Sequence, residues 1–116
     1  MYLFAIAAKV NPKSKLAKEF REVGGAFVNC YISFKNYQAA EKLARLLIRE
    51  NGWIPMKETN AYKLTRSRLK TKKDRQYYSE ALRDGYCLVF HTWPRRRGQA
   101  LANNGDIRET KAQPQD

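Results

Sequence analysis

The chain has 116 residues and a mass of 13.5 kDa, so we expect one domain rather than a multidomain assembly. Apolar residues make up 43% and charged residues 29%, which excludes a fibrous repeat and a chain that is disordered throughout. The unusual quantity is charge: 23 Lys and Arg stand against 11 Asp and Glu, a formal net charge of +12. Such an excess concerns partners and solubility rather than fold.

The first elements are predicted from hydrophobic period. Apolar residues alternate along residues 2–10, as in a strand with one strongly apolar face. Asn11 and Pro12 then supply an N-cap and a first helical position. We therefore expect a short amphipathic helix over roughly 12–22, which ends at Gly24-Gly25.

The next two elements repeat this change of period. Residues 26–34 alternate again, and one face of the predicted strand consists of Val28, Cys30, Ile32 and Phe34. Residues 37–50 carry an apolar stripe at helical spacing, and Asn51-Gly52 ends that helix.

The last elements include one irregular strand. A segment from residue 53 to about 64 is extended, but Pro55 removes a hydrogen-bond donor and favours an edge strand or an early bulge. Thr71 and Asp74 have the spacing of a capping box, so a helix follows until Asp84-Gly85. Residues 86–93 are a largely buried strand.

Together these elements predict an α+β fold over residues 1–97 and a flexible C-terminal tail over 98–116. We expect a four-stranded, mainly antiparallel sheet with two to three helices mostly on one face, in a ferredoxin-like layer, because two strands alternate apolar with polar or small residues. The alternative is a parallel, three-layer α/β fold, which strict alternation of strands and helices also allows.

Cysteines and targeting signals indicate a cytoplasmic protein. Cys30 and Cys87 lie in apolar runs, where a free thiol behaves as a small buried hydrophobe, although a disulfide between them stays open. The apolar N-terminal run has no basic segment before it and lacks a cleavage site. No stretch approaches the ~20 apolar residues of a membrane span, so we expect no membrane partner.

The positive charge is concentrated in the last third of the predicted domain. Residues 62–97 hold 11 Lys and Arg against 3 Asp and Glu, which is +8 of the total +12. Such a patch is typical of a protein that binds a phosphate backbone, although it also fits a solvated surface or an acidic protein partner. The predicted binding residues for nucleic acid or another anion are Lys63, Arg66, Arg68, Lys70, Lys72, Lys73, Arg75, Arg95, Arg96 and Arg97.

An aromatic surface is predicted on the face of the sheet away from the helices. It comprises Phe27, Tyr31, His91 and Trp93. Aromatic side chains on an open sheet suit base stacking, and they equally suit the interface of a homodimer, which we also expect.

No complete catalytic or metal-binding signature is present. His91 is the single histidine, its spacing from the cysteines does not match a zinc site, and no glycine-rich phosphate loop occurs, so we predict no metal and no cofactor. The carboxylates are scattered, and no acid–base pair is identified among them. The leading hypothesis is a small, non-enzymatic basic domain that binds nucleic acid. The alternative is a protein-binding accessory factor of the inhibitor or immunity type, and the third is a weak nuclease using His91, Tyr77 and nearby arginines.

Overall fold

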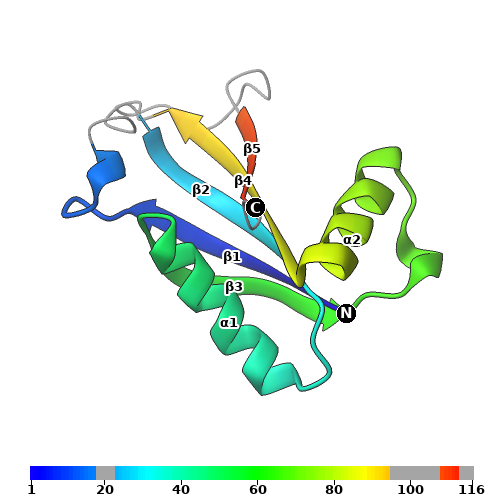
Figure 1. The fold of residues 1–116 in the computed structure, drawn as a ribbon. Helices are drawn as coiled ribbons and strands as arrows, with labels where there is room; N and C mark the ends of the chain where they lie inside the picture. The colour runs from blue at the N-terminus through cyan, green and yellow to red at the C-terminus, as the bar shows by residue number, and fades with distance from the viewer. Residues whose placement is uncertain (18–22, 95–107, 113–116) are drawn as a thin grey trace.

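The computed structural model describes residues 1–17, 23–94 and 108–112 (Figure 1). Its strands are β1 (Tyr2–Val10), β2 (Val23–Ile32), β3 (Trp53–Lys63), β4 (Tyr86–Pro94) and β5 (Arg108–Ala112), and its α-helices are α1 (Tyr37–Glu50) and α2 (Lys72–Asp84). Two short 3-10 helices, η1 (Lys15–Ala17) and η2 (Arg66–Arg68), lie in connections.

The strands form one open sheet in the order β3-β1-β2-β4-β5, and every neighbouring pair is antiparallel. The α+β prediction is therefore confirmed, and the parallel alternative is wrong. The predicted count of four strands is one too low, because residues 108–112 of the predicted tail pair with the free edge of β4. This strand has no apolar alternation of its own, and its place comes from backbone pairing with a strand distant in the sequence. The rest of the predicted tail, residues 98–107 and 113–116, lies outside the described part of the chain.

Helix α1 covers one face of the sheet. Alternate residues of the central strands, such as Phe4, Val28 and Cys30, pack against buried residues of the helix, including Ala44 and Ile48. This face forms the main core, and its residues on β2 are those that the alternation predicts.

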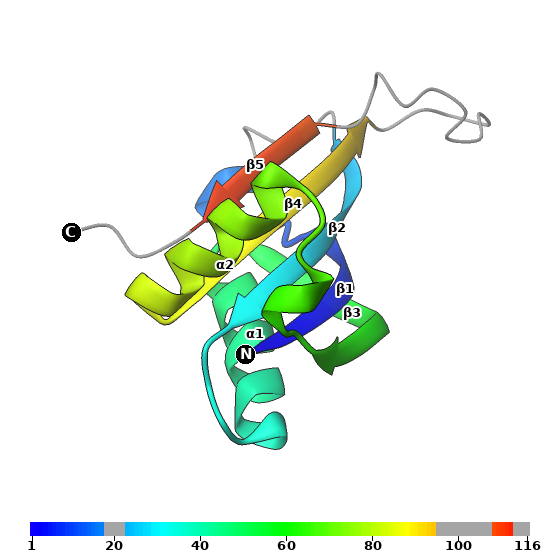
Figure 2. The same ribbon diagram turned by 90° about the vertical axis from the view of Figure 1, so that its right-hand side faces the viewer.

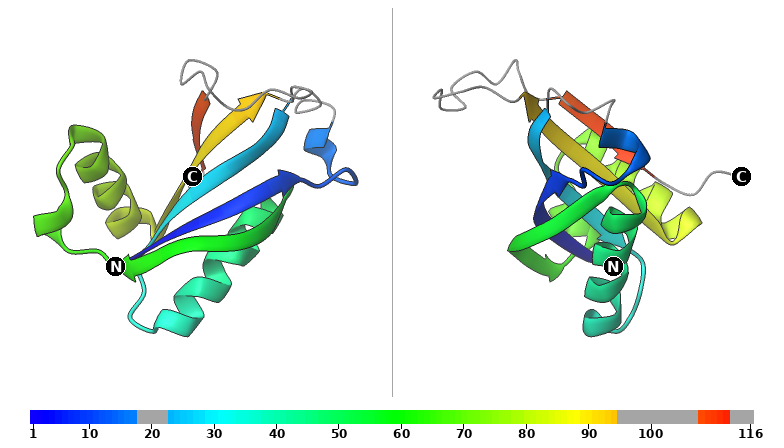
Figure 3. Two further views of the ribbon diagram at one scale, coloured as in Figure 1. Left: turned by 180° about the vertical axis from the view of Figure 1, so that it is seen from behind. Right: turned by 90° about the vertical axis from the view of Figure 1, so that its left-hand side faces the viewer.

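Helix α2 covers part of the opposite face. Tyr31, Cys87 and Val89 pack there against Tyr77 and Ala81 of α2. Figures 1 and 3 show the two helices on either side of the sheet, and Figure 2 shows α2 in front of β4. The prediction that the helices lie mostly on one face is therefore wrong, and the ferredoxin-like layer is not confirmed. The physical reason is that β4 is apolar on both faces near its start, so both faces need cover.

Local signals located several element ends. Helix α1 spans the predicted residues, with the side chain of Asn36 accepting a hydrogen bond from the backbone N–H of Ala39. The capping box of Thr71 and Asp74 is present at the start of α2. β3 is an edge strand, and its register against β1 shifts close to Pro55, so both readings of that proline are confirmed.

The predicted helix over 12–22 is wrong within the described residues. Asn11 caps a turn there, and only the three residues of η1 are helical, whereas residues 18–22 lie outside the described part. Gly24 and Gly25 do not end a helix but lie within β2. A Cβ at Gly25 would lie 2.6 Å from the Trp93 ring, so these glycines make room for that side chain.

Candidate nucleic-acid interface

The basic segment, residues 63–75, connects β3 to the first turn of α2. It is held by apolar residues that alternate with its cations. Leu64 is buried, and its backbone N–H donates to the carbonyl of Met1 at 2.9 Å. Leu69 packs against the cluster under α2. These anchors give the intervening cations a defined place on the surface.

All the cations of the basic segment are exposed; they are Lys63, Arg66, Arg68, Lys70, Lys72, Lys73 and Arg75. The guanidinium of Arg68 lies over the ring of Tyr62, 4.9 Å from its centroid. Asp74 is the only acidic residue of the segment, and its carboxylate accepts from the backbone N–H of Thr71 at 3.3 Å. The acid is therefore used as a helix cap, and the surface of the segment stays strongly positive. The predicted residues Arg95, Arg96 and Arg97 lie outside the described part of the chain.

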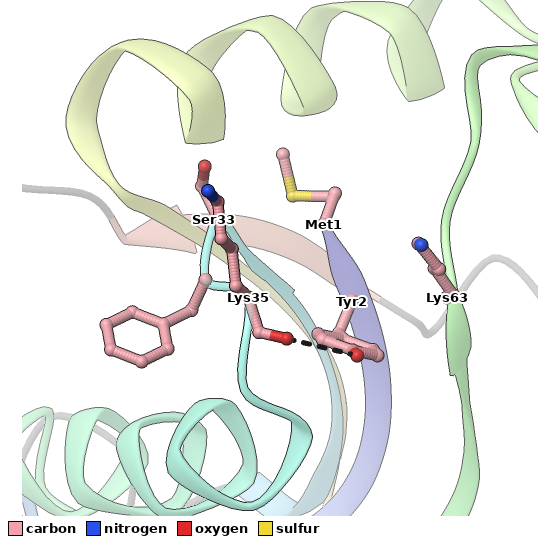
Figure 4. Close-up of a pocket in the computed structure, with 6 residues that line it drawn as sticks. Met1, Tyr2, Ser33, Lys35 and Lys63 are labelled. Carbon is pink, nitrogen blue, oxygen red and sulfur yellow. Dashed lines mark hydrogen bonds between the residues drawn. The ribbon is translucent and has the colours of Figure 1, made fainter.

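A hollow of about 560 Å³ adjoins the start of the basic segment. It lies where β1 begins and where β2 and β3 end, and its lining consists of Met1, Tyr2, Ser33, Phe34, Lys35 and Lys63. Figure 4 shows Lys35 and Lys63 on opposite sides of Met1 and Tyr2. The Tyr2 hydroxyl donates to the Lys35 carbonyl at 3.3 Å, which ties the loop after β2 to β1.

The predicted aromatic face is only partly open. Phe27 is 45% exposed, and its ring centroid lies 4.9 Å from that of Trp93. Tyr31 is only 5% exposed, because it lies under α2 against Tyr77. Phe27, Trp93 and half-buried His91 thus share a surface from which Tyr31 is excluded.

Glu109 of β5 joins the side chains of the third hypothesis. Its carboxylate accepts a hydrogen bond from the Tyr77 hydroxyl and lies 3.6 Å from Lys73 Nζ and 3.9 Å from His91 Nδ1. The bond from Tyr77 lowers the pKa of Glu109, and the charges of Lys73 and His91 act in the same direction against the opposing effect of burial. The other ring nitrogen of His91 lies 3.4 Å from the Asn29 amide. The network connects β5 to α2 and β4.

Two carboxylates that the sequence does not pair come together beside α1. Burial raises the pKa of Glu58, and a hydrogen bond to Glu41 together with its charge raises it further, while Arg45 opposes them. Glu58 on β3 and Glu41 on α1 therefore form an interacting pair of carboxyl groups.

Cys30 and Cys87 form no disulfide with each other, and they lie on opposite faces of the sheet. Cys30 pairs across the strands with Leu88, whereas Cys87 pairs with Tyr31. Since neighbouring residues of a strand point to opposite faces, a disulfide between the two cysteines does not fit this register. Burial raises the pKa of the Cys30 thiol, which makes it a poor nucleophile.

Sequence reasoning missed three residues that the fold brings to these surfaces. Lys35 and Phe34 were assigned no functional role. Phe34 was predicted on the core face of a strand, but β2 ends at Ile32 and Phe34 is 49% exposed. Glu109 was placed in the tail. The sequence around Glu109 gives no sign that this residue lies beside His91, because that neighbourhood depends on the pairing of β5 with β4.

Neither known proteins nor the described part of the structure adds a family, a membrane-spanning helix or a metal site. Comparison with protein families, with curated proteins and with solved structures finds no match to this chain. Within the described residues, no helix is both long and apolar enough to cross a membrane. In the same part of the chain, no three His, Cys, Asp or Glu side chains are grouped so as to hold a metal ion.

Proposed function

We propose that this protein is a small basic binding domain, and that it contacts the phosphate backbone of nucleic acid through the basic segment. The observation that carries the proposal is the exposure of all seven cations between residues 63 and 75, together with the use of Asp74 as a helix cap. Lys and Arg that neutralise phosphates release counterions, and this term supplies most of the affinity in such complexes.

The arrangement supports a backbone contact rather than a scattered surface charge. The cations come from the end of β3, from η2, from the connection at Lys70 and from the first turn of α2, so they lie on one continuous piece of chain. The Lys73 ammonium forms an ion pair with the Glu109 carboxylate at 3.6 Å. Because this charge is already partly compensated, Lys73 is a weaker phosphate ligand than the other six.

The test is a titration of labelled single- and double-stranded DNA and RNA at about 50 and 200 mM salt. If all seven cations neutralise phosphates on a single strand, the logarithm of affinity falls with a slope of about 5 against the logarithm of salt concentration, since each contributes about 0.7. Changing four of them to glutamine should reduce the slope by about 2–3, since Lys73 contributes less than a full phosphate contact. The four are Arg66, Arg68, Lys72 and Lys73.

A matched control separates a local contact from the effect of net charge. Four exposed cations outside the segment are changed to glutamine instead, which also lowers the formal charge from +12 to +8. They are Lys13, Lys42, Arg49 and Lys57. The control variant should keep most of the wild-type slope. Absence of binding at low salt, or equal losses in both variants, contradicts the proposal, and nuclease-resistant capture of an acidic protein would favour the accessory-factor alternative.

A second candidate is RNA cleavage, which is favoured by the convergence of His91 and Tyr77 on Glu109. A histidine beside an ionised carboxylate is a pair used in general acid–base catalysis. RNA is incubated with the protein in the presence of a chelator, and the products are resolved on a gel. Cleavage that is lost in His91→Ala and in Glu109→Gln supports this candidate. Absence of cleavage, or cleavage that persists in both variants, refutes it.

The homodimer and the cytoplasmic location also stay proposals. The surface that we assign to the dimer is exposed Phe27 together with half-buried Trp93, whose ring lies against it. Light scattering should give twice the chain mass of 13.5 kDa, and a Phe27→Ala variant should shift the mass toward that of one chain. A wild-type particle with the mass of one chain refutes the dimer.

A further inference from the structure

We propose that the hollow beside the basic segment binds one unpaired nucleotide of a single-stranded nucleic acid, with the phosphate between Lys35 and Lys63 and the base against Phe34. The inference rests on the proposed function and specifies its ligand. It predicts a preference for single strands over duplexes.

The charge and composition of the lining fit a nucleotide. Lys35 comes from the loop after β2 and Lys63 from the end of β3, and they flank the hollow from two sides (Figure 4). Among the described residues that line it, none is acidic. Ser33 adds a hydroxyl group, which both donates and accepts hydrogen bonds.

The apolar part of the lining fits a base. Phe34 is 49% exposed, although a large aromatic side chain in a loop would gain free energy from burial. Aromatic rings stack on any base, because every base has a π-face. In a duplex the bases are already stacked, and extruding one costs a few kcal/mol, so an unpaired base reaches Phe34 at a lower cost.

The size and construction of the hollow also fit. Its volume of about 560 Å³ lies within the range of about 300–1,000 Å³ that small-molecule sites occupy. Its walls are held by hydrogen bonds: the Tyr2 hydroxyl donates to Lys35, and the backbone N–H of Ser33 donates to the Gly85 carbonyl at 2.9 Å. The site is therefore formed without a ligand.

The hollow is continuous with the basic segment. Lys63 lines the hollow and is also the first cation of the segment, and it pairs with Tyr2 across the β1–β3 ladder. The backbone N–H of the next residue, Leu64, donates a hydrogen bond to the carbonyl of Met1 at the wall of the hollow. A strand whose phosphates follow the segment is thus led to the hollow at one end.

The experiment measures fluorescence anisotropy of the full chain with a short labelled oligothymidylate and with a hairpin duplex of equal charge. Phe34→Ala should weaken binding of the oligothymidylate about tenfold and leave duplex binding unchanged, because stacking of a single base is lost. Phe34→Trp should restore the affinity. Lys35→Gln should lower the salt slope with the oligothymidylate by about 0.7.

Matched controls come from α1. Leu46 is 48% exposed, so Leu46→Ala removes a similar exposed apolar group, and Lys42→Gln removes an exposed charge. Both control variants should bind as the wild type does. Thermal unfolding of Phe34→Ala checks that the variant is folded, which we expect because this side chain is outside the core.

The outcomes separate the two proposals. If the variant of the basic segment loses affinity while Phe34→Ala and Lys35→Gln bind both probes as the wild type does, the hollow is not a nucleotide site and the proposed function stands. Equal or tighter binding of the duplex by the wild type likewise overturns the inference alone. If the wild type binds neither probe at low salt, both proposals fall.

Discussion

Replacing Glu58 by glutamine should stabilise the protein near neutral pH but not in acid. The Oε1 atom of Glu58 is buried, and no group in the described part of the chain donates a hydrogen bond to it. Arg45, whose guanidinium donates to the Met56 carbonyl at 3.0 Å, offsets the charge only partly. Burial first, and then Glu41, raise the pKa of Glu58 above its ordinary value of 4.5.

The raised pKa of Glu58 sets the sign of its effect on stability at each pH. A carboxyl whose pKa is raised by folding favours the folded state while it is protonated, below pH 4.5, and this contribution is lost as the pH rises through the raised pKa. Above this raised pKa the folded protein holds the Glu58 carboxylate in the charged form, which burial and the neighbouring Glu41 disfavour. Glutamine has nearly the same shape, carries no charge, and offers an N–H to Glu41.

The magnitude comes from the exposure of the group. An unsatisfied buried acceptor costs about 1–3 kcal/mol, and because Glu58 is only partly buried we take about 1 kcal/mol. For a domain of 116 residues this corresponds to a rise in Tm of about 4 °C.

The assay is thermal unfolding followed by circular dichroism at about pH 4 and pH 7. Glu58→Gln should raise Tm at the higher pH and leave it unchanged at the lower one. Glu50→Gln, at the exposed end of α1, is the control and should change stability by less than about 0.5 kcal/mol. An equal shift at both pH values, or a lower Tm at neutral pH, would refute the reasoning.

Three further predictions concern local features of the fold. Thr71→Ala removes the capping box of α2 and should lower stability by about 1 kcal/mol in urea unfolding, with Cm reduced and m unchanged. Gly25→Ala places a Cβ against the Trp93 ring and should cost about 1–3 kcal/mol, with a change in tryptophan emission; unchanged emission would contradict that contact. Tyr77→Phe removes the hydrogen bond to Glu109, so the amides of β5 should exchange with deuterium faster while those of β1 and β2 keep their rates.

Elements defined by neighbouring residues were accessible from the sequence. The period of residues 37–50 and the capping box at Thr71 depend on side chains within one or two helical turns. Pro55 likewise identified an edge strand, because a missing N–H is tolerated where no partner strand needs it. The exposure of the cations between residues 63 and 75 followed from their density, since that many charges are not buried together.

The surfaces that could carry function depend on pairing between distant residues. In β4 the alternation alone does not say which face each residue joins, and a shift of one residue would exchange the faces. The observed register places Tyr31 and Cys87 under α2, and it places Glu109 beside His91.

Composition and local pattern by themselves determined a basic α+β domain and its cationic segment, because those properties are carried by each stretch of chain. Only the tertiary structure decided that the helices take opposite faces and that Lys35 and Lys63 line the same hollow. The reason is that strand order and register, which are properties of the whole sheet, decide whether residues 28 positions apart line the same hollow.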